Sequence, residues 1–209
     1  MIKIENLNKS FGDKKIIKDF NCNFNEKSMT AITGKSGCGK TTLLNIIGLL
    51  DLDFDGTVLY DNVQVSIKKE KERNKFIRNN INYLFQNYAL IDSETVYDNL
   101  LLALEYEKIS KTEKKKRIDE ALKMVDLNDY SEKKVYTLSG GEQQRVALAR
   151  IILKTGNIIL ADEPTGNLDK ENSERVMKVL KTFRDNGKTI IIVTHDENIA
   201  NQCDNVIRW

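Results

Sequence analysis

The chain has 209 residues, of which 40% are hydrophobic and 31% charged, as is typical of one ordinary globular domain. Its formal net charge of +2 argues against a dedicated nucleic-acid-binding protein, so no nucleic acid is expected as a partner. No stretch approaches the roughly 20 apolar residues of a membrane span, and the N-terminus lacks a signal-peptide pattern, so a cytoplasmic location is expected.

The cysteines and the basic runs limit which metal, redox and binding functions are expected. The three cysteines, Cys22, Cys38 and Cys203, are odd in number and match neither a zinc site nor a redox pair, so reduced thiols are expected. The basic runs Lys68–Arg78 and Lys111–Arg117 could bind nucleic acid or lipid, but such runs favour a solvated helix face.

The N-terminal part predicts short strands around one helix. Met1–Leu7 and Lys15–Phe24 alternate between apolar and polar residues, as half-buried strands do. Met29–Thr33 is a short apolar run that leads into a glycine-rich loop. Apolar residues then recur at helical spacing in Leu43–Leu50, and Gly56–Val65 has the pattern of a hairpin.

The remainder of the chain alternates between helix and strand patterns. Tyr97–Leu127 is charged, amphipathic and free of β-branched runs, so we expect mostly helices there. Asn157–Ala161 and Thr189–Thr194 are continuous apolar runs of the kind found in parallel strands buried on both faces, with a helix over Ser173–Asn186 between them. These units predict an α/β fold with a mainly parallel sheet, into which the middle segment is inserted as a helical lobe.

The loop after the strand Met29–Thr33 carries a phosphate-binding motif. Gly34–Thr41 fits the pattern G-x-x-x-x-G-K-[ST] between a predicted strand and a predicted helix. Glycines let successive backbone N–H groups face an anion, Lys40 can reach the β- and γ-phosphates of a nucleotide, and Thr41 can complete a Mg²⁺ site. A structural glycine turn is the alternative. The candidate nucleotide ligands are Gly34, Lys35, Ser36, Gly37, Cys38, Gly39, Lys40, Thr41 and Thr42.

Two adjacent carboxylates follow the apolar strand Asn157–Ala161. Asp162 and Glu163 would be costly if they were buried without partners, and a Mg²⁺ ion and a water explain them. Asp162 would hold the metal through a water, whereas Glu163, on the other face of the strand, would orient or deprotonate the attacking water. A strand-end pair in contact with solvent is the alternative.

The only histidine, His195, follows the apolar strand Thr189–Thr194. Ligands of open α/β sheets bind at the carboxyl ends of the strands, so His195 is a candidate contact of a γ-phosphate. A surface histidine with no such role is the alternative.

Leu138–Arg145, with the sequence Leu-Ser-Gly-Gly-Glu-Gln-Gln-Arg, indicates a loop that opens a helix. Ser139 and Glu142 have the spacing of a capping box, which alone would make this a well-capped helix start. A cap does not explain two successive glycines followed by Glu-Gln-Gln-Arg. The free N–H groups and the positive end of the helix dipole would let the segment bind a γ-phosphate.

On these motifs the whole chain resembles the ATP-binding cassette ATPases. Leu138–Gln143 matches the signature motif of that family letter for letter, and the other motifs follow in the family's order. The resemblance implies one domain with a P-loop NTPase core, a mainly parallel sheet, an N-terminal antiparallel β subdomain and an inserted α-helical subdomain. The core and β subdomain would comprise residues 1–86 and 138–209, and the helical subdomain about residues 87–137.

The resemblance also implies roles for single residues. Gln86 would be the Q-loop glutamine, which contacts Mg²⁺ and water and faces the membrane partner, and His195 the switch histidine. Phe11 would stack on adenine, with a core phenylalanine as the alternative, and Asp169 would be the acid of the D-loop. The implied catalytic residues are Glu163, His195 and Gln86, and the implied metal ligands are Thr41, Gln86 and Asp162. The implied signature contacts to nucleotide are Ser139, Gly140, Gly141, Glu142 and Gln143.

By the same resemblance the chain acts as a homodimer in the ATP-bound state, with ATP and Mg²⁺ as cofactors. Two chains would pack head to tail, with each nucleotide between Gly34–Thr42 of one chain and Ser139–Gln143 of the other, and hydrolysis would reopen them. The partner would be an integral membrane permease encoded separately, which places the chain on the inner face of the cell membrane. A soluble cassette that acts on DNA or ribosomes is disfavoured by the near-neutral charge.

A narrower resemblance concerns Glu163–Asp169 and Phe85–Tyr88. Both are similar to the branch that contains macrolide exporters, lipoprotein-release ATPases, a cell-division ATPase and bacitracin- or bacteriocin-type peptide systems. Export of a peptide, drug or lipid-linked substrate is therefore expected, with ATP-driven mechanotransmission without transport as the alternative. Cassettes of this branch continue past the strand that matches Asn205–Trp209 into one more turn and strand, whereas this sequence ends at Trp209.

Overall fold

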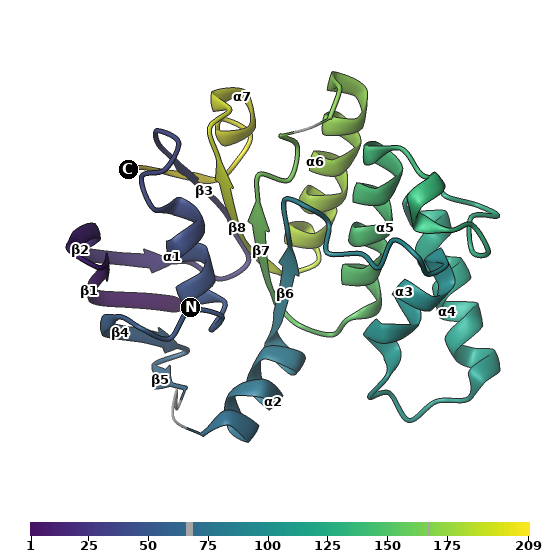
Figure 1. The fold of residues 1–209 in the computed structure, drawn as a ribbon, viewed down its shortest axis with the longest axis horizontal. Helices are drawn as coiled ribbons and strands as arrows, with labels where there is room; N and C mark the ends of the chain where they lie inside the picture. The colour runs from purple at the N-terminus through teal and green to yellow at the C-terminus, as the bar shows by residue number, and fades with distance from the viewer. Residues whose placement is uncertain (66–68, 167) are drawn as a thin grey trace. The chain divides into compact units, whose positions relative to one another are not determined.

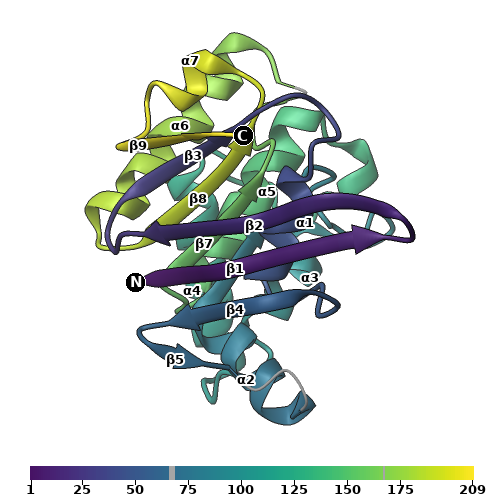
Figure 2. The same cartoon turned by 90° about the vertical axis from the view of Figure 1, so that its left-hand side faces the viewer.

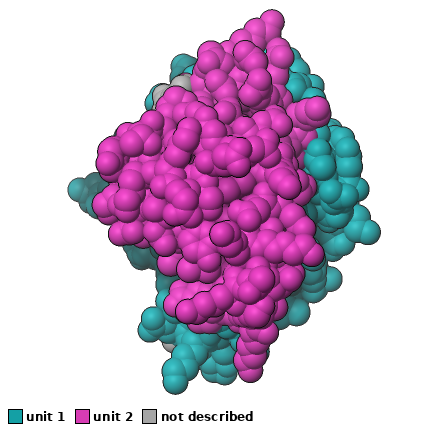
Figure 3. Space-filling view, turned by 90° about the vertical axis from the view of Figure 1, so that its right-hand side faces the viewer, with its two compact units in different colours: residues 1–83, 156–163, 181–209 teal, residues 84–155, 164–180 magenta. Residues whose placement is uncertain are grey.

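The computed structural model describes residues 1–65, 69–166 and 168–209 (Figure 1). Lys68 of the first basic run and Asn167 of the segment after Glu163 therefore lie outside the described residues. The chain folds as two compact units, which Figure 3 colours separately. The first unit comprises residues 1–83, 156–163 and 181–209, and the second comprises residues 84–155 and 164–180.

The first unit contains an antiparallel sheet with the strand order β2-β1-β4-β5 (Figure 2). Its central strand β1 pairs with β2 on one side and with β4 on the other. Alternate residues of β1 are buried, as the period of two in the sequence predicts. The strands are β1 (Ile2–Phe11), β2 (Lys14–Phe24), β4 (Asp55–Tyr60) and β5 (Val63–Gln64).

The alternation of β1 changes phase at Asn6, whose φ is +50°. Ile4 is buried before this residue, and Leu7 and Lys9 are buried after it, because the irregular register between Ile4 and Leu7 adds one residue. Gly56 of β4 allows the bend, since a Cβ on Gly56 would lie 2.6 Å from the carbonyl oxygen of Asn6. The phase change is the reason that Lys9, a lysine, points to the buried face.

A second sheet has five strands in the order β6-β7-β8-β3-β9. Strand β3 pairs in parallel with β8 and β9, and β7 pairs in parallel with β8. Every residue of β3 and β8 is buried, as their continuous apolar runs predict. The carboxyl ends of parallel strands lie at one edge of the sheet. The strands are β3 (Met29–Thr33), β6 (Ile81–Leu84), β7 (Ile158–Asp162), β8 (Thr189–Thr194) and β9 (Asn205–Arg208).

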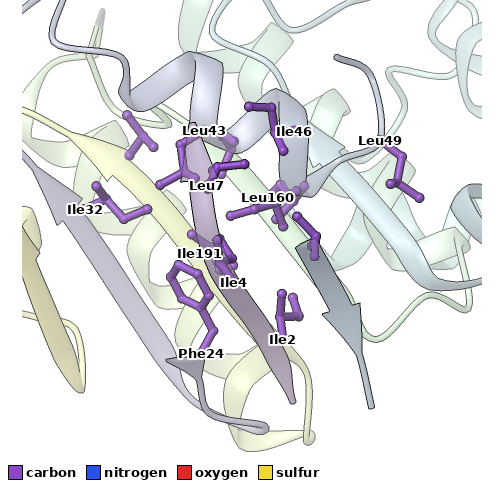
Figure 4. Packing of buried hydrophobic residues seen from close by; sticks show 14 of the residues in the cluster. Ile2, Ile4, Leu7, Phe24, Ile32, Leu43, Ile46, Leu49, Leu160 and Ile191 are labelled. Carbon is purple, nitrogen blue, oxygen red and sulfur yellow. The ribbon is translucent and has the colours of Figure 1, made fainter. Parts of the chain in front are cut away.

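One hydrophobic cluster joins the two sheets to helix α1 (Lys40–Ile47) (Figure 4). Leu7 of the antiparallel sheet, Leu43 of α1 and Leu160 of the parallel sheet are all fully buried in it. Burial of apolar surface contributes roughly 25 cal/mol per Å², so this cluster is a main source of stability in the unit. It also fixes the loop between β3 and α1, because both flanking elements are anchored in the core.

The other helices of the first unit lie near its surface. Helix α2 (Glu70–Asn80) has no buried residue, which agrees with a solvated face for the first basic run. Helix α7 (Glu197–Ala200) begins after Asp196, whose side chain accepts a hydrogen bond from the backbone N–H of Asn198. No helix in the described part of the chain is long and apolar enough to cross a membrane.

Helices dominate the second unit. Thr95 and Ser110 cap two of them through hydrogen bonds to the backbone three residues on. Helices α3 and α4 both pack against α5 within this unit. The helices are α3 (Val96–Leu101), α4 (Lys111–Met124), α5 (Gly140–Leu153) and the first part of α6 (Lys170–Asp185), with short 3-10 turns η1 (Leu102–Leu104) and η2 (Val135–Thr137).

Candidate active site

The phosphate loop lies between the end of β3 and the start of α1. Gly37 and Gly39 have φ values of +75° and +110°, a region that favours glycine. A Cβ on Gly39 would also lie 2.6 Å from Cγ2 of Ile16, so packing requires this glycine as well. Among the described residues no side chain caps α1. Its first N–H groups are therefore available to an anion in the loop.

Lys40 is folded across the phosphate loop and is only 6% exposed. Its Nζ donates to the carbonyl oxygens of Gly34 at 2.8 Å and Lys35 at 3.0 Å. Its Nζ also lies 4.0 Å from Cys38 Sγ. A buried ammonium that is held by carbonyl oxygens and a thiol sulfur can still neutralise a bound phosphate.

Asp162 ends β7 and is hydrogen-bonded to the first turn of α1. Its Oδ1 accepts a hydrogen bond of 3.1 Å from Thr41 Oγ1. Burial raises the pKa of Asp162; the Thr41 hydrogen bond opposes that effect, the neighbouring Glu163 carboxylate adds to it, and Lys40 opposes it. Burial and the neighbouring carboxylate therefore favour a further positive charge at Asp162. A carboxylate and a hydroxyl are hard oxygen ligands, so the pair fits a Mg²⁺ ion.

Glu163 is anchored at both carboxylate oxygens. Oε1 lies 2.8 Å from His195 Nδ1, and Oε2 accepts a hydrogen bond of 3.2 Å from Thr194 Oγ1. Because a carboxylate only accepts, the contact with His195 places the proton on Nδ1 and leaves Nε2 for a ligand. The Glu163 side chain is 14% exposed and that of His195 is 67% exposed. Glu163 has a φ of +45°, an uncommon conformation for a residue with a Cβ.

The signature segment forms the predicted capping box at the start of α5. Ser139 Oγ accepts from the Glu142 backbone N–H at 3.3 Å, and Glu142 Oε2 accepts from the Ser139 N–H at 2.7 Å. Tyr130 donates its hydroxyl to Glu142 Oε1 at 2.7 Å, and this bond is the main cause of the lowered pKa of Glu142. Ser139 and Gly140 are exposed. The Glu142 carboxylate therefore holds the helix start, and the exposed backbone remains for a ligand.

Phe11 ends β1 and is 55% exposed, so it is not a core phenylalanine. Lys9 Nζ lies 4.8 Å from the centroid of its ring, in a cation–π contact. The same ammonium donates to Asp51 Oδ1 at 2.9 Å and to the carbonyl oxygen of Asp53. The ring is thus held by a buried cation while it remains open to a flat ligand.

The first unit brings five predicted residues together at the carboxyl edge of the parallel sheet. Lys40 and Thr41 follow the loop after β3, Asp162 and Glu163 end β7, and His195 follows β8. The sequence predicted these residues singly but not the hydrogen bond between Glu163 and His195, which are 32 positions apart.

Gln86, the signature segment and Asp169 belong to the second unit. Gln86 is exposed just after β6, and the Ser139–Gln143 segment starts α5. Asp169 caps α6, because its Oδ1 accepts from the backbone N–H of Asn172 at 2.8 Å. Sequence reasoning missed Thr194, which holds Glu163. Its position one residue before the histidine was the available signal.

Comparison with known proteins agrees with this geometry. The family model described as ABC transporter matches residues 17–166. The lipoprotein-releasing system ATP-binding protein LolD of Bacteroides thetaiotaomicron is 40% identical over 208 residues, which cover 99% of this chain and 95% of LolD. The macrolide export ATP-binding/permease protein MacB of Mannheimia succiniciproducens is 37% identical over 211 residues, which cover 99% of this chain but 33% of MacB.

Solved structures agree as well. The dimeric structure of MJ0796, an ABC transporter cassette from Methanocaldococcus jannaschii, has a TM-score of 0.92 at 39% identity and covers 100% of this chain and 94% of its own. A dimeric post-hydrolysis state of that cassette, bound to ADP and Pi, has a TM-score of 0.92 at 38% identity. The predicted P-loop NTPase fold is therefore confirmed. The chain belongs to the ABC transporter family, as one of its ATP-hydrolysing cassettes.

Proposed function

We propose that this ATPase is the nucleotide-binding subunit of a transporter, in which two copies close around two Mg-ATP and drive a separately encoded membrane permease. The observation that carries the proposal is the group at the sheet edge, where Glu163 is anchored beside the Thr41–Asp162 pair. The Ser139–Gln143 segment, with Ser139 and Gly140 exposed, would bind the γ-phosphate of a nucleotide held by the second copy. The similarity to the dimeric MJ0796 cassette supports this arrangement.

Each residue at the sheet edge would have a separate role in ATP hydrolysis. Lys40 would neutralise the β- and γ-phosphates, and a Mg²⁺ ion held by Thr41 and Asp162 would supply further positive charge. Glu163 would take a proton from the attacking water through a lone pair that its present partners leave free. His195, whose Nδ1 contacts Glu163, could contact the γ-phosphate through Nε2.

The names of the relatives support a membrane partner. LolD is named as the ATP-binding protein of a lipoprotein-releasing system, and MacB is named as an ATP-binding/permease protein for macrolide export. A permease would place the chain in the cytoplasm at the inner face of the cell membrane. The relatives named for lipoprotein release and macrolide export favour a peptide, drug or lipid-linked substrate.

A capture experiment tests this proposal. Tagged Glu163→Gln protein is held with ATP and Mg²⁺ in native membranes, extracted in mild detergent and analysed by mass spectrometry, with Lys40→Ala as the control that cannot bind ATP. We expect one multi-span membrane protein in stoichiometric amount, recovered more strongly with Glu163→Gln. An extracellular sensor domain in that partner would indicate mechanotransmission in place of transport. Recovery of only soluble proteins, ribosomes or nucleic acid would contradict the transporter role.

A further inference from the structure

Side chains at the start of α5 are bonded to the chain that follows Glu163. Gln144 is buried, and its Nε2 donates to the carbonyl oxygen of Pro164 at 2.7 Å. The next residue, Arg145, donates from its guanidinium to Asn172 Oδ1 at 2.5 Å. All of these residues except Glu163 lie in the second unit. The signature helix and the start of α6 are therefore joined by specific hydrogen bonds.

Asn172 uses both ends of its amide in this connection. Oδ1 accepts from Arg145, while Nδ2 donates to Asp169 Oδ2 at 2.9 Å. The backbone N–H of Asn172 donates to the other oxygen of Asp169 at 2.8 Å. Both hydrogen bonds from Asn172 lower the pKa of Asp169, and the backbone bond has the larger effect. An amide can accept from a guanidinium and donate to a carboxylate at once, which a carboxylate or a methyl group cannot do.

Gly141 packs closely against the Asn172 amide. A Cβ at position 141 would lie 2.8 Å from Asn172 Cγ and 2.9 Å from both Nδ2 and Oδ1. The clash could not be relieved cheaply, because the Asn172 side chain is held by Arg145 and Asp169. The absence of a side chain at Gly141 therefore lets the amide lie against the first turn of α5.

We propose that Asn172 is a positioning residue, which locks the start of α5, where the signature segment Ser139–Gln143 lies, to Asp169 and the start of α6 so that they move as one body. The inference rests on the proposed function, in which the signature segment binds nucleotide held by the second copy. ATP binding by a single copy uses Lys40 and the phosphate loop, so the lock should not affect it.

The test uses Glu163→Gln protein as the parent, so that a closed dimer would accumulate with ATP. Asn172→Ala should raise the ATP concentration for half-maximal dimer about tenfold, as loss of charge-assisted hydrogen bonds of this kind predicts. Dimer is measured by light scattering, and ATP binding to monomer by calorimetry at low protein concentration. Glu174→Ala, an exposed change on the same helix, is the matched control. The conservative Asn172→Asp keeps an acceptor for Arg145 but should not restore dimer formation, since it repels Asp169.

A double-mutant cycle with Gly141 gives a readout that general destabilisation would not produce. Gly141→Ala should also raise the ATP requirement about tenfold in the parent, but less than about twofold when Asn172→Ala is present, because alanine removes all three clashing atoms. Thermal unfolding of the double variant should be no lower than that of Asn172→Ala, since alanine favours a helix over glycine.

The outcomes separate the lock from the function on which it rests. A parent that stays monomeric with ATP overturns the proposed dimeric function, and the role of Asn172 with it. If the parent dimerises but Asn172→Ala behaves like Glu174→Ala, the lock is wrong and the function stands. The lock is also wrong if Gly141→Ala raises the ATP concentration for half-maximal dimer by the same factor with and without Asn172→Ala. In that case Gly141 would serve only to let the nucleotide approach the backbone.

Discussion

Replacement of Gly39 by alanine should destabilise the protein through two separable effects. At a φ of +110°, a residue with a Cβ costs about 1–3 kcal/mol of backbone strain. The new Cβ would lie 2.6 Å from Cγ2 of Ile16, and overpacking of this kind costs about 1–3 kcal/mol more. The free energy of unfolding should therefore fall by about 2–6 kcal/mol, a large share of the roughly 5–15 kcal/mol of a typical protein.

Two other glycines isolate the backbone effect. Gly12 and Gly37 also have positive φ, but a Cβ on either would meet no atom within 4 Å, so Gly12→Ala and Gly37→Ala should cost about 1–3 kcal/mol. Urea unfolding of the nucleotide-free protein measures each variant. Ile16→Ala removes the clashing methyl and should reduce the cost of Gly39→Ala. The packing argument is refuted if Gly39→Ala costs no more than Gly12→Ala, or if Ile16→Ala does not change its cost.

Two further predictions concern buried charge. Lys9→Met should lower the free energy of unfolding by about 1–3 kcal/mol, because Asp51 is left partly buried without its cation, and thermal unfolding should shift by about 2–4 °C per kcal/mol. Asp53→Asn should change the free energy of unfolding by less than about 0.5 kcal/mol, since that side chain is 97% exposed. If Asp53→Asn destabilised the protein as much as Lys9→Met, the argument from burial would be contradicted. Burial raises the pKa of Asp162, so its ionisation costs stability as the pH rises through the folded-state pKa. Asp162→Asn should therefore be more stable than the parent at neutral pH without nucleotide and equal to it below the ordinary value of 3.8; a difference that is independent of pH would contradict this.

The sequence predicts those parts of the fold that local patterns determine. Apolar runs identify β3, β7 and β8, and the cap at Ser139 places the start of α5. The phase change of β1 at Asn6 could not be predicted, because it depends on the fit of Gly56 from a neighbouring strand. The burial of Lys9 follows from that phase change, and a simple alternating pattern hides it.

The same distinction holds for the candidate site. Lys40, Thr41 and Asp162 are recognisable from spacing, since the chemistry of phosphate and Mg²⁺ demands those residue types at those positions. The anchoring of Glu163 by His195 depends on the pairing of β7 with β8, which brings residues distant in sequence together. The bridge through Asn172 depends likewise on tertiary contact between α5 and the start of α6, and no motif marks it.

The most direct test of the central claim is the oligomeric state of Glu163→Gln protein with ATP and Mg²⁺, measured by light scattering beside its rate of ATP hydrolysis. We predict a dimer with ATP, a monomer with ADP, and loss of most turnover with ATP binding retained, because Glu163 would accept the proton of the attacking water. A variant that hydrolyses ATP at the parent rate, or that stays monomeric with bound ATP, would contradict the claim that two copies close around ATP with Glu163 as the base.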